Sequence, residues 1–219
     1  MKIIGLIASL ILTFFSIGQK SYYFSEALPS NQKAQSVVDK KWHGKYAVNN
    51  GKNILEVNSD GVFMVSTTIS SISREEIRES TKYDVRDNYI FGVVINDSLP
   101  CVLEDERYFF GIRNKDVIVG AGSKNELRPS GRVANEFILN TYENGYFLPS
   151  IIRFETKNIS TAQLDYDFET TVFDFIQEKK SVQGQNIEII ILKPDVSEFN
   201  ALLKDVTIFS ILDEFKKTK

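Results

Sequence analysis

The chain has 219 residues, of which 42% are hydrophobic and 25% charged, and its formal net charge is −3 at pH 7. This mild acidity gives no support to the binding of nucleic acids or of anionic membranes, which need a basic surface. One cysteine and one histidine exclude an intramolecular disulfide and a histidine-rich zinc site, so we expect a core held together by burial alone, without a cofactor.

The first 18 residues have the pattern of a secretory signal peptide. Lys2 gives a positive start, an uncharged apolar run follows, and Ser16-Ile17-Gly18 supplies the small residues that a signal peptidase reads. The run is shorter than the roughly 20 residues of a membrane-spanning helix, and an uncleaved anchor is the alternative. We therefore expect an exported chain, periplasmic or extracellular, with no membrane span after signal removal. Cys101 lies far from the cleavage point, which argues against a lipoprotein.

Residues 19–40 read as a polar lead-in of uncertain order, and residues 41–219 as a single β-rich domain. From Trp42 onward, short apolar or alternating segments are separated by residues that favour tight turns. Asparagine, aspartate and glycine supply the positive φ angles of hairpin turns, so about ten strands in an antiparallel meander are predicted. The strongest of these turns are Asn50-Gly51, Asn58-Ser59-Asp60-Gly61 and Glu143-Asn144-Gly145.

Two segments have helical signals instead. Ser73 precedes Glu76 by three residues in the form of a capping box, which predicts a short helix that ends near Ser80. Near the C-terminus, Phe199 and the apolar residues after it recur at helical spacing. This spacing predicts a C-terminal helix over about 196–217.

Taken together, these elements predict an all-β to β-dominated fold. We expect an antiparallel meander that forms a closed or partly closed barrel, with a C-terminal helical segment. A two-sheet sandwich is the alternative.

Few residues suggest catalysis or metal binding. Asp165, Asp167 and Glu169 alternate with apolar residues, which places the three carboxylates on one strand face about 7 Å apart. Such a face suits a hard cation such as calcium, or an acid/base pair. The same alternation is typical of a half-buried strand with its charges in water, and we favour that interpretation. Arg107-Tyr108-Phe109-Phe110 is interpreted as a core strand.

The segment Trp42-His43-Gly44-Lys45-Tyr46, followed by a hairpin, resembles the opening of lipocalin-like (calycin-type) barrels. In that family a Gly and a Trp begin the first strand, the Trp closes the barrel floor, and a helix follows the strands. The resemblance implies structural roles for Trp42, Gly44 and Tyr46. It departs from the family pattern because Gly44 follows Trp42, whereas the family's Gly precedes its Trp. A plain core anchor is the other interpretation of Trp42.

Three functional hypotheses follow. The favoured one is a non-catalytic structural or interaction protein of the cell envelope, which predicts an exposed apolar patch or an open strand edge and an envelope protein as partner. The first alternative is a lipocalin-like carrier with a small apolar ligand in a cavity. The second is a carboxylate-based hydrolase in which Asp165 and Asp167 converge with other acids in a cleft.

Overall fold

The computed structural model describes residues 19–35, 38–48, 53–164, 170–183, 187–204 and 209–218. Its contacts divide the chain into two compact units. Unit 1 contains the described parts of Met1–Ser36, Ser123–Glu155 and Ile159–Glu214, and unit 2 those of Val37–Gly122, Thr156–Asn158 and Phe215–Lys219. Each unit has a hydrophobic cluster of its own. The single domain over residues 41–219 stays a prediction. The expected signal peptide, residues 1–18, lies outside the described residues.

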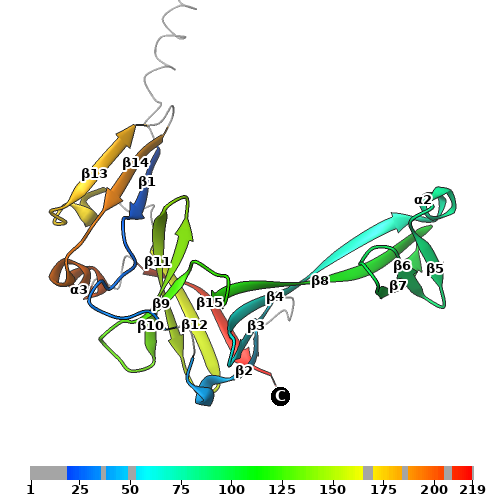
Figure 1. The fold of residues 1–219 in the computed structure, drawn as a ribbon, viewed down its shortest axis with the longest axis horizontal. Helices are drawn as coiled ribbons and strands as arrows, with labels where there is room; N and C mark the ends of the chain where they lie inside the picture. The colour runs from blue at the N-terminus through cyan, green and yellow to red at the C-terminus, as the bar shows by residue number, and fades with distance from the viewer. Residues whose placement is uncertain are drawn as a thin grey trace, which may run out of the picture. The chain divides into compact units, whose positions relative to one another are not determined.

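Unit 1 is a sheet with helical segments packed against it. Its strands follow the order β13 (Lys179–Gln183), β14 (Ile187–Leu192), β1 (Gln19–Phe24), β11 (Tyr146–Phe154) and β12 (Asn158–Leu164), while β10 (Glu136–Glu143) pairs with β11 and with β9 (Glu126–Pro129) (Figure 1). Among the described strand pairs, β1 and β14 alone run parallel. Buried residues of α3 (Val196–Lys204) and η3 (Thr170–Phe173) pack in the same core as strand residues; the core contains Tyr22, Phe24, Leu28, Ile138, Ile151, Phe173, Ile176, Leu192, Phe199, Leu202 and Leu203. The lead-in 19–40 therefore begins with a strand that contributes to this core.

Unit 2 is antiparallel throughout its described pairs. The end of β15 (Phe209–Lys217) pairs with β2 (Gly44–Ala47), and β3 (Asn53–Asn58), β4 (Gly61–Ser73), β8 (Arg107–Gly120), β7 (Ser98–Glu104), β6 (Tyr89–Phe91) and β5 (Asp84–Arg86) follow in that order. η2 (Lys40–Trp42) precedes β2, and α2 (Arg74–Glu79) follows β4.

Two predicted turns are confirmed by their backbone angles. Gly61 has a φ of +141°, and a Cβ built there would lie 1.9 Å from the carbonyl oxygen of Val119, so only glycine fits between β3 and β4. Asn144 and Gly145 have φ values of +52° and +94°, which suit the tight turn between β10 and β11. The turn at Asn50-Gly51 lies outside the described residues.

The capping box at the start of α2 is also confirmed. The Glu76 backbone N–H donates to Ser73 Oγ at 3.1 Å, and the Ser73 N–H donates to Glu76 Oε2 at 2.7 Å. These bonds satisfy two backbone groups that the first turn of a helix leaves free. The helix ends after Glu79, close to the predicted end at Ser80.

The β-dominated class is confirmed, but the sheet is not closed into a barrel. Closure needs the first and last strands to pair, whereas in unit 2 the strand order runs out at β5, and in unit 1 at β13. A physical reason lies in β4 and β8, which have 13 and 14 residues. Both extend past their shorter neighbours, so these strands form a ribbon between two groups of short strands instead of curving around one axis.

The C-terminal helix is present but shorter than predicted. α3 ends at Lys204, and Phe209–Lys217 forms strand β15. Helical spacing did not decide the conformation here because β2 offers backbone partners: Lys216 lies opposite Ala47, and the Thr218 N–H donates to the Lys45 carbonyl at 2.8 Å. Phe215 is buried in this arrangement.

Candidate interaction surface

The long strands of unit 2 end in a small sheet with two distinct faces. β3 pairs with β4 as far as Ser66, and β7 pairs with β8 from Phe110 onward. At residues 67–69 of β4 and 111–113 of β8, the two strands have only each other among the described strands (Figure 1). We call residues 69–111, which contain α2, β5, β6, β7 and the adjoining ends of β4 and β8, the tip.

The inner face of the tip sheet is covered. Ile90, Cys101 and Phe110 are buried there, and Ile77 of α2 and Val93 of the loop after β6 pack against them. Burial raises the pKa of the Cys101 thiol, so the thiol is a core group in its neutral form. The tip thus has a small hydrophobic core on one side of its sheet.

The outer face of the tip sheet is apolar and open. Strand residues alternate between faces, so the neighbours of the buried residues point outward. Val102 lies opposite Phe109, Ile69 opposite Gly111, and Tyr89 opposite Pro100. Ile69 is 72% exposed, Val102 67% and Tyr89 46%. We define the outer face by Ile69, Tyr89, Pro100, Val102 and Phe109.

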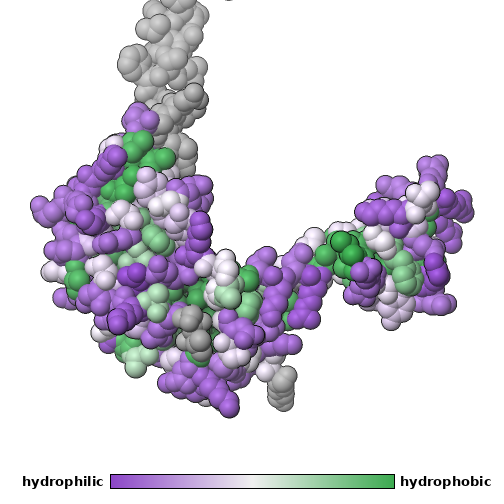
Figure 2. Space-filling view, in the orientation of Figure 1, coloured by the Kyte–Doolittle hydropathy of each residue, from purple (hydrophilic) through white to green (hydrophobic). Residues whose placement is uncertain are grey.

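A second apolar feature of the tip is the loop between β6 and β7. Asn96 has a φ of +58°, and the turn that it makes leaves Ile95 89% exposed. A pocket of about 510 Å³ lies beside this loop, lined by Lys82, Phe91 and residues 92–98. Hydrophobic side chains are visible at the surface where the ribbon meets the tip (Figure 2).

Two arginines near the outer face are held by neighbouring residues. Arg86 donates to Asp84 and lies 5.3 Å from the ring centre of Phe91. This hydrogen bond from Arg86 lowers the pKa of the Asp84 carboxyl. Arg107 Nε donates to Ser71 Oγ at 3.0 Å. An apolar centre with a polar rim is the usual anatomy of a protein–protein interface.

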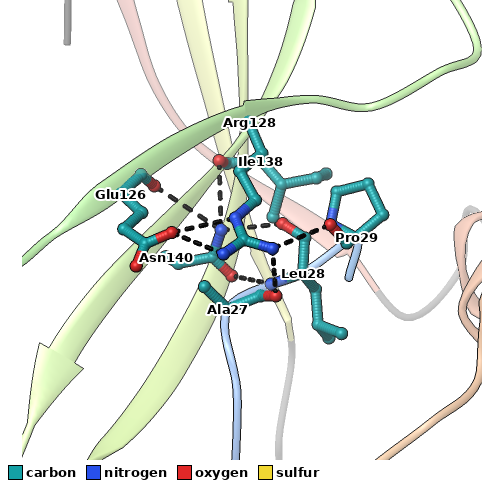
Figure 3. A network of polar contacts seen from close by, with 7 residues as sticks. All are labelled: Ala27, Leu28, Pro29, Glu126, Arg128, Ile138 and Asn140. Atoms are coloured by element: carbon teal, nitrogen blue, oxygen red, sulfur yellow. Dashed lines mark hydrogen bonds and ion pairs between the residues drawn. The ribbon is translucent and has the colours of Figure 1, made fainter. Parts of the chain in front are cut away.

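A polar network in unit 1 holds the segment after β1. Asn140 is fully buried; its Oδ1 accepts the Leu28 N–H at 2.8 Å and its Nδ2 donates to the Leu28 carbonyl at 2.7 Å (Figure 3). Arg128 Nη1 donates to the carbonyls of Ala27 and Pro29 at 2.9 and 3.0 Å, and its other nitrogens bond Glu126. The donors and acceptors serve the backbone of this chain, which is the pattern of a structural network.

Glu136 is a buried carboxylate that two arginines hold. Arg132 and Arg153 approach it to 2.8 and 2.6 Å. Burial alone would raise the pKa of Glu136, but hydrogen bonds from Arg153, Ser130 and Arg132 outweigh burial, and the pKa lies below its usual value. A general acid needs the opposite shift and access to a substrate, so Glu136 is a structural anion.

The residues that carried the lipocalin-like resemblance lie together in unit 2. Trp42 is buried at the end of η2, and the Tyr46 hydroxyl, also buried, donates to the Trp42 carbonyl at 2.7 Å. Gly44 has a φ of +153°, and a Cβ there would lie 2.7 Å from Cε of Lys217. His43 Nε2 bonds the Val38 carbonyl at 3.0 Å. Each contact fixes the start of β2.

Asp165, Asp167 and Glu169 lie outside the described residues, so their convergence on a site stays a prediction. Within the described ranges, no three His, Cys, Asp or Glu side chains are grouped as metal ligands. No helix in the described part of the chain is long and apolar enough to cross a membrane.

No family model, no curated protein and no solved structure matches this chain.

The outer face was missed by the sequence analysis, although one signal for it was present. Arg107-Tyr108-Phe109-Phe110 was interpreted as a core strand. Consecutive aromatic residues on a strand necessarily place aromatic rings on both faces of the sheet. Phe110 faces the tip core and Phe109 the outer face, so this run indicates a sheet with two apolar faces.

Proposed function

We propose that this chain is a non-catalytic interaction protein that binds another protein through the outer face of its tip. The observation that carries the proposal is the contrast between the two faces of one sheet. α2 and a loop cover the inner face, whereas the outer face has an apolar centre that no described element covers. An apolar face of this kind is stabilised by a partner that removes it from water.

The size of the outer face indicates the class of interaction. The outer face exposes only a few large side chains, and functional apolar patches on monomers typically measure about 300–600 Å². Buried area does not convert directly into affinity, because association costs about 4–15 kcal/mol in lost freedom of motion. One outer face alone therefore supports a weak, reversible complex with a compact apolar patch on the partner.

The polar clusters of unit 1 support a non-catalytic role. The carboxylate of Glu136 is saturated by arginine donors, and Asn140 and Arg128 bond backbone groups of residues 27–29. Their arrangement stabilises the fold and leaves these groups engaged. The carrier and hydrolase hypotheses stay predictions.

Export is part of the proposal. The apolar run after Lys2 and the small residues at Ser16-Ile17-Gly18 support it. We expect the denaturing mass of protein from a secreting host to correspond to a chain that begins at Gln19. An intact Met1 would contradict export by signal cleavage.

Site-specific photo-cross-linking tests the interaction surface. A photoreactive amino acid replaces Val102 in cells that produce the protein naturally, and a matched variant carries it at Val182, an exposed valine of β13. We expect a discrete foreign protein to be cross-linked from position 102 and not from position 182. Identical products from both positions, or none from position 102, would refute the proposed surface.

A further inference from the structure

Over residues 67–73, the edge of β4 that faces away from β8 has no strand partner among the described residues. β3 reaches Ser66 and α2 begins at Arg74, and no described strand pairs with β4 between them. The Arg74 N–H donates to the Glu106 carbonyl at 2.9 Å, which continues the β4–β8 register. Hydrogen-bonded pairs alternate along an antiparallel ladder. The backbone groups of Thr67, Ile69 and Ser71 therefore point away from β8.

The Ser73 backbone agrees with this direction, because its N–H is bonded by the Glu76 carboxylate and not by β8. The Ser71 carbonyl accepts a long bond of 3.4 Å from Arg107. These two backbone groups are therefore engaged within the chain. The outward-facing groups of Thr67 and Ile69 and the N–H of Ser71 are the ones that an added strand would pair with.

The chemistry of this edge differs from that of the other open edge of the ribbon. β8 carries Arg113, Lys115 and Asp116 beyond its pairing with β7. Charged residues on an edge strand discourage the addition of another strand. β4, by contrast, has no charged residue from Gly61 to Ser73. Of the two strands, only β4 has no charged side chain of its own along its open edge, although Arg107 of β8 reaches this edge at Ser71.

We propose that β4 pairs along this edge with β4 of a second copy of the chain, antiparallel and about a two-fold axis at Ser70. This inference rests on the proposed function because it enlarges the same surface. A two-fold axis places equal residues near one another, so an uncharged edge avoids the repulsion that the edge of β8 would create. Ser66, where β3 ends, and Arg74, where α2 begins, are equally distant from Ser70 along the chain. In the paired state, Ser66 of one copy, the last β4 residue that pairs with β3, then lies opposite Arg74 of the other copy, where α2 begins.

The pairing explains how a small outer face reaches a functional size. The axis is perpendicular to the sheet, so both outer faces lie on the same side of one continuous sheet. Ile69 of the two copies become diagonal neighbours, about 7–8 Å apart. Pairing therefore doubles the apolar surface offered to one partner, and a standard stable interface takes about 800 Å² from each side.

Native mass spectrometry and sedimentation of the purified full chain over a concentration series test the second copy. We expect a dimer for the wild type and a monomer for Ile69→Lys, with dimerisation weakened at least about tenfold because the edge gains two like charges near the axis. Val102→Lys is the matched control, since both side chains are about equally exposed (72% and 67%) but Val102 is on β7. It should remain a dimer. A monomeric wild type, or a dimer that Ile69→Lys leaves intact, overturns the proposal.

Disulfide trapping tests the register independently of charge. Ser70→Cys places two cysteines directly opposite each other, with Cα atoms about 4.5 Å apart, which a disulfide spans. Thr68→Cys is the control, because its mirror residue is Ile72 of the second copy and the two cysteines lie about 13 Å apart along the strands. The native Cys101 is buried. We expect a disulfide-linked dimer from Ser70→Cys alone; equal trapping by Thr68→Cys contradicts the register.

These tests separate the two proposals. A monomer that still cross-links a foreign protein through position 102 overturns the second copy and supports the proposed function. A dimer with the Ser70 register and no foreign product at position 102 supports the edge pairing and refutes the proposed surface.

Discussion

Val102 and Phe109 lie directly opposite each other on β7 and β8, on the face of the tip sheet that is turned away from the buried Cys101 and Phe110. Cys101 and Phe110, their neighbours in sequence, fill the tip core, whereas Val102 and Phe109 lie on the opposite face of the sheet. A strand with apolar residues on both faces is typical of a sheet that is covered on both sides. Because the described residues cover only one side, the pair lies on the face that we propose for a partner.

The two faces of the tip predict opposite responses to truncation. Phe110→Ala should lower the free energy of unfolding of the tip by about 3–5 kcal/mol, because it removes a buried ring from a small core. Val102→Ser, on the outer face, should change it by less than about 0.5 kcal/mol. Urea denaturation with hydrogen exchange of tip amides measures both. A large loss for Val102→Ser would show that the outer face is covered within the chain.

The Asn140 network should be sensitive to loss of the amide. Asn140→Ala leaves the buried Leu28 N–H and carbonyl without their partner, and each unsatisfied group costs about 1–3 kcal/mol. We expect a loss of about 3 kcal/mol in urea denaturation. The control is Ser150→Ala, since the Ser150 hydroxyl is only part-buried and its bond to Leu139 is long, at 3.3 Å. A loss no larger than that of the control would mean that water replaces the amide.

Glu136 predicts a stability that falls in acid. Its folded-state pKa lies below the unfolded value, so its contribution is complete above the unfolded pKa and is lost as the pH falls through the folded pKa. Glu136→Gln should cost about 3 kcal/mol at neutral pH because both arginines lose their anion. The variant should also flatten the decline in stability below about pH 4.3, the ordinary glutamate value. Thermal or urea unfolding as a function of pH measures both effects, and an unchanged acid profile would contradict them.

Gly61 should be intolerant of a side chain. Gly61→Ala places a Cβ against the Val119 carbonyl oxygen, where the backbone leaves no room, and we expect a loss of about 3 kcal/mol or more. Gly122→Ala is the control, with a φ of +84° and nothing within 4 Å of the new Cβ. It retains only the conformational cost, about 1 kcal/mol. Equal losses in urea denaturation would exclude the close contact as the cause.

The Cys101 thiol should react slowly in the folded protein. Its burial and raised pKa keep the thiolate scarce. Titration with a thiol-reactive chromophore at pH 8 should show complete modification in urea and little over the same time without it. Fast modification in native conditions would indicate that the tip core opens readily.

Local chemistry in the sequence was sufficient for several elements. The capping box of Ser73 and Glu76, the turn residues at Gly61 and Asn144-Gly145, and the start of α3 were all predicted correctly. In each case the determining hydrogen bond, φ angle or cap lies within a few residues along the chain. Such signals are short in range, and one sequence contains them completely.

The tertiary structure decided what depends on distant partners. Apolar residues in Phe209–Lys217 continue a helical spacing, yet this segment forms β15, whose end pairs with β2 from the other end of the chain. Closure into a barrel also failed for a non-local reason, since the extension of β4 and β8 past their neighbours depends on where β3 and β7 stop pairing. The β-rich class, the turns and the caps were thus determined by the sequence itself. The open edge of β4 and the uncovered outer face arise only from pairing across the sheet, because exposure belongs to a residue's surroundings and not to its type.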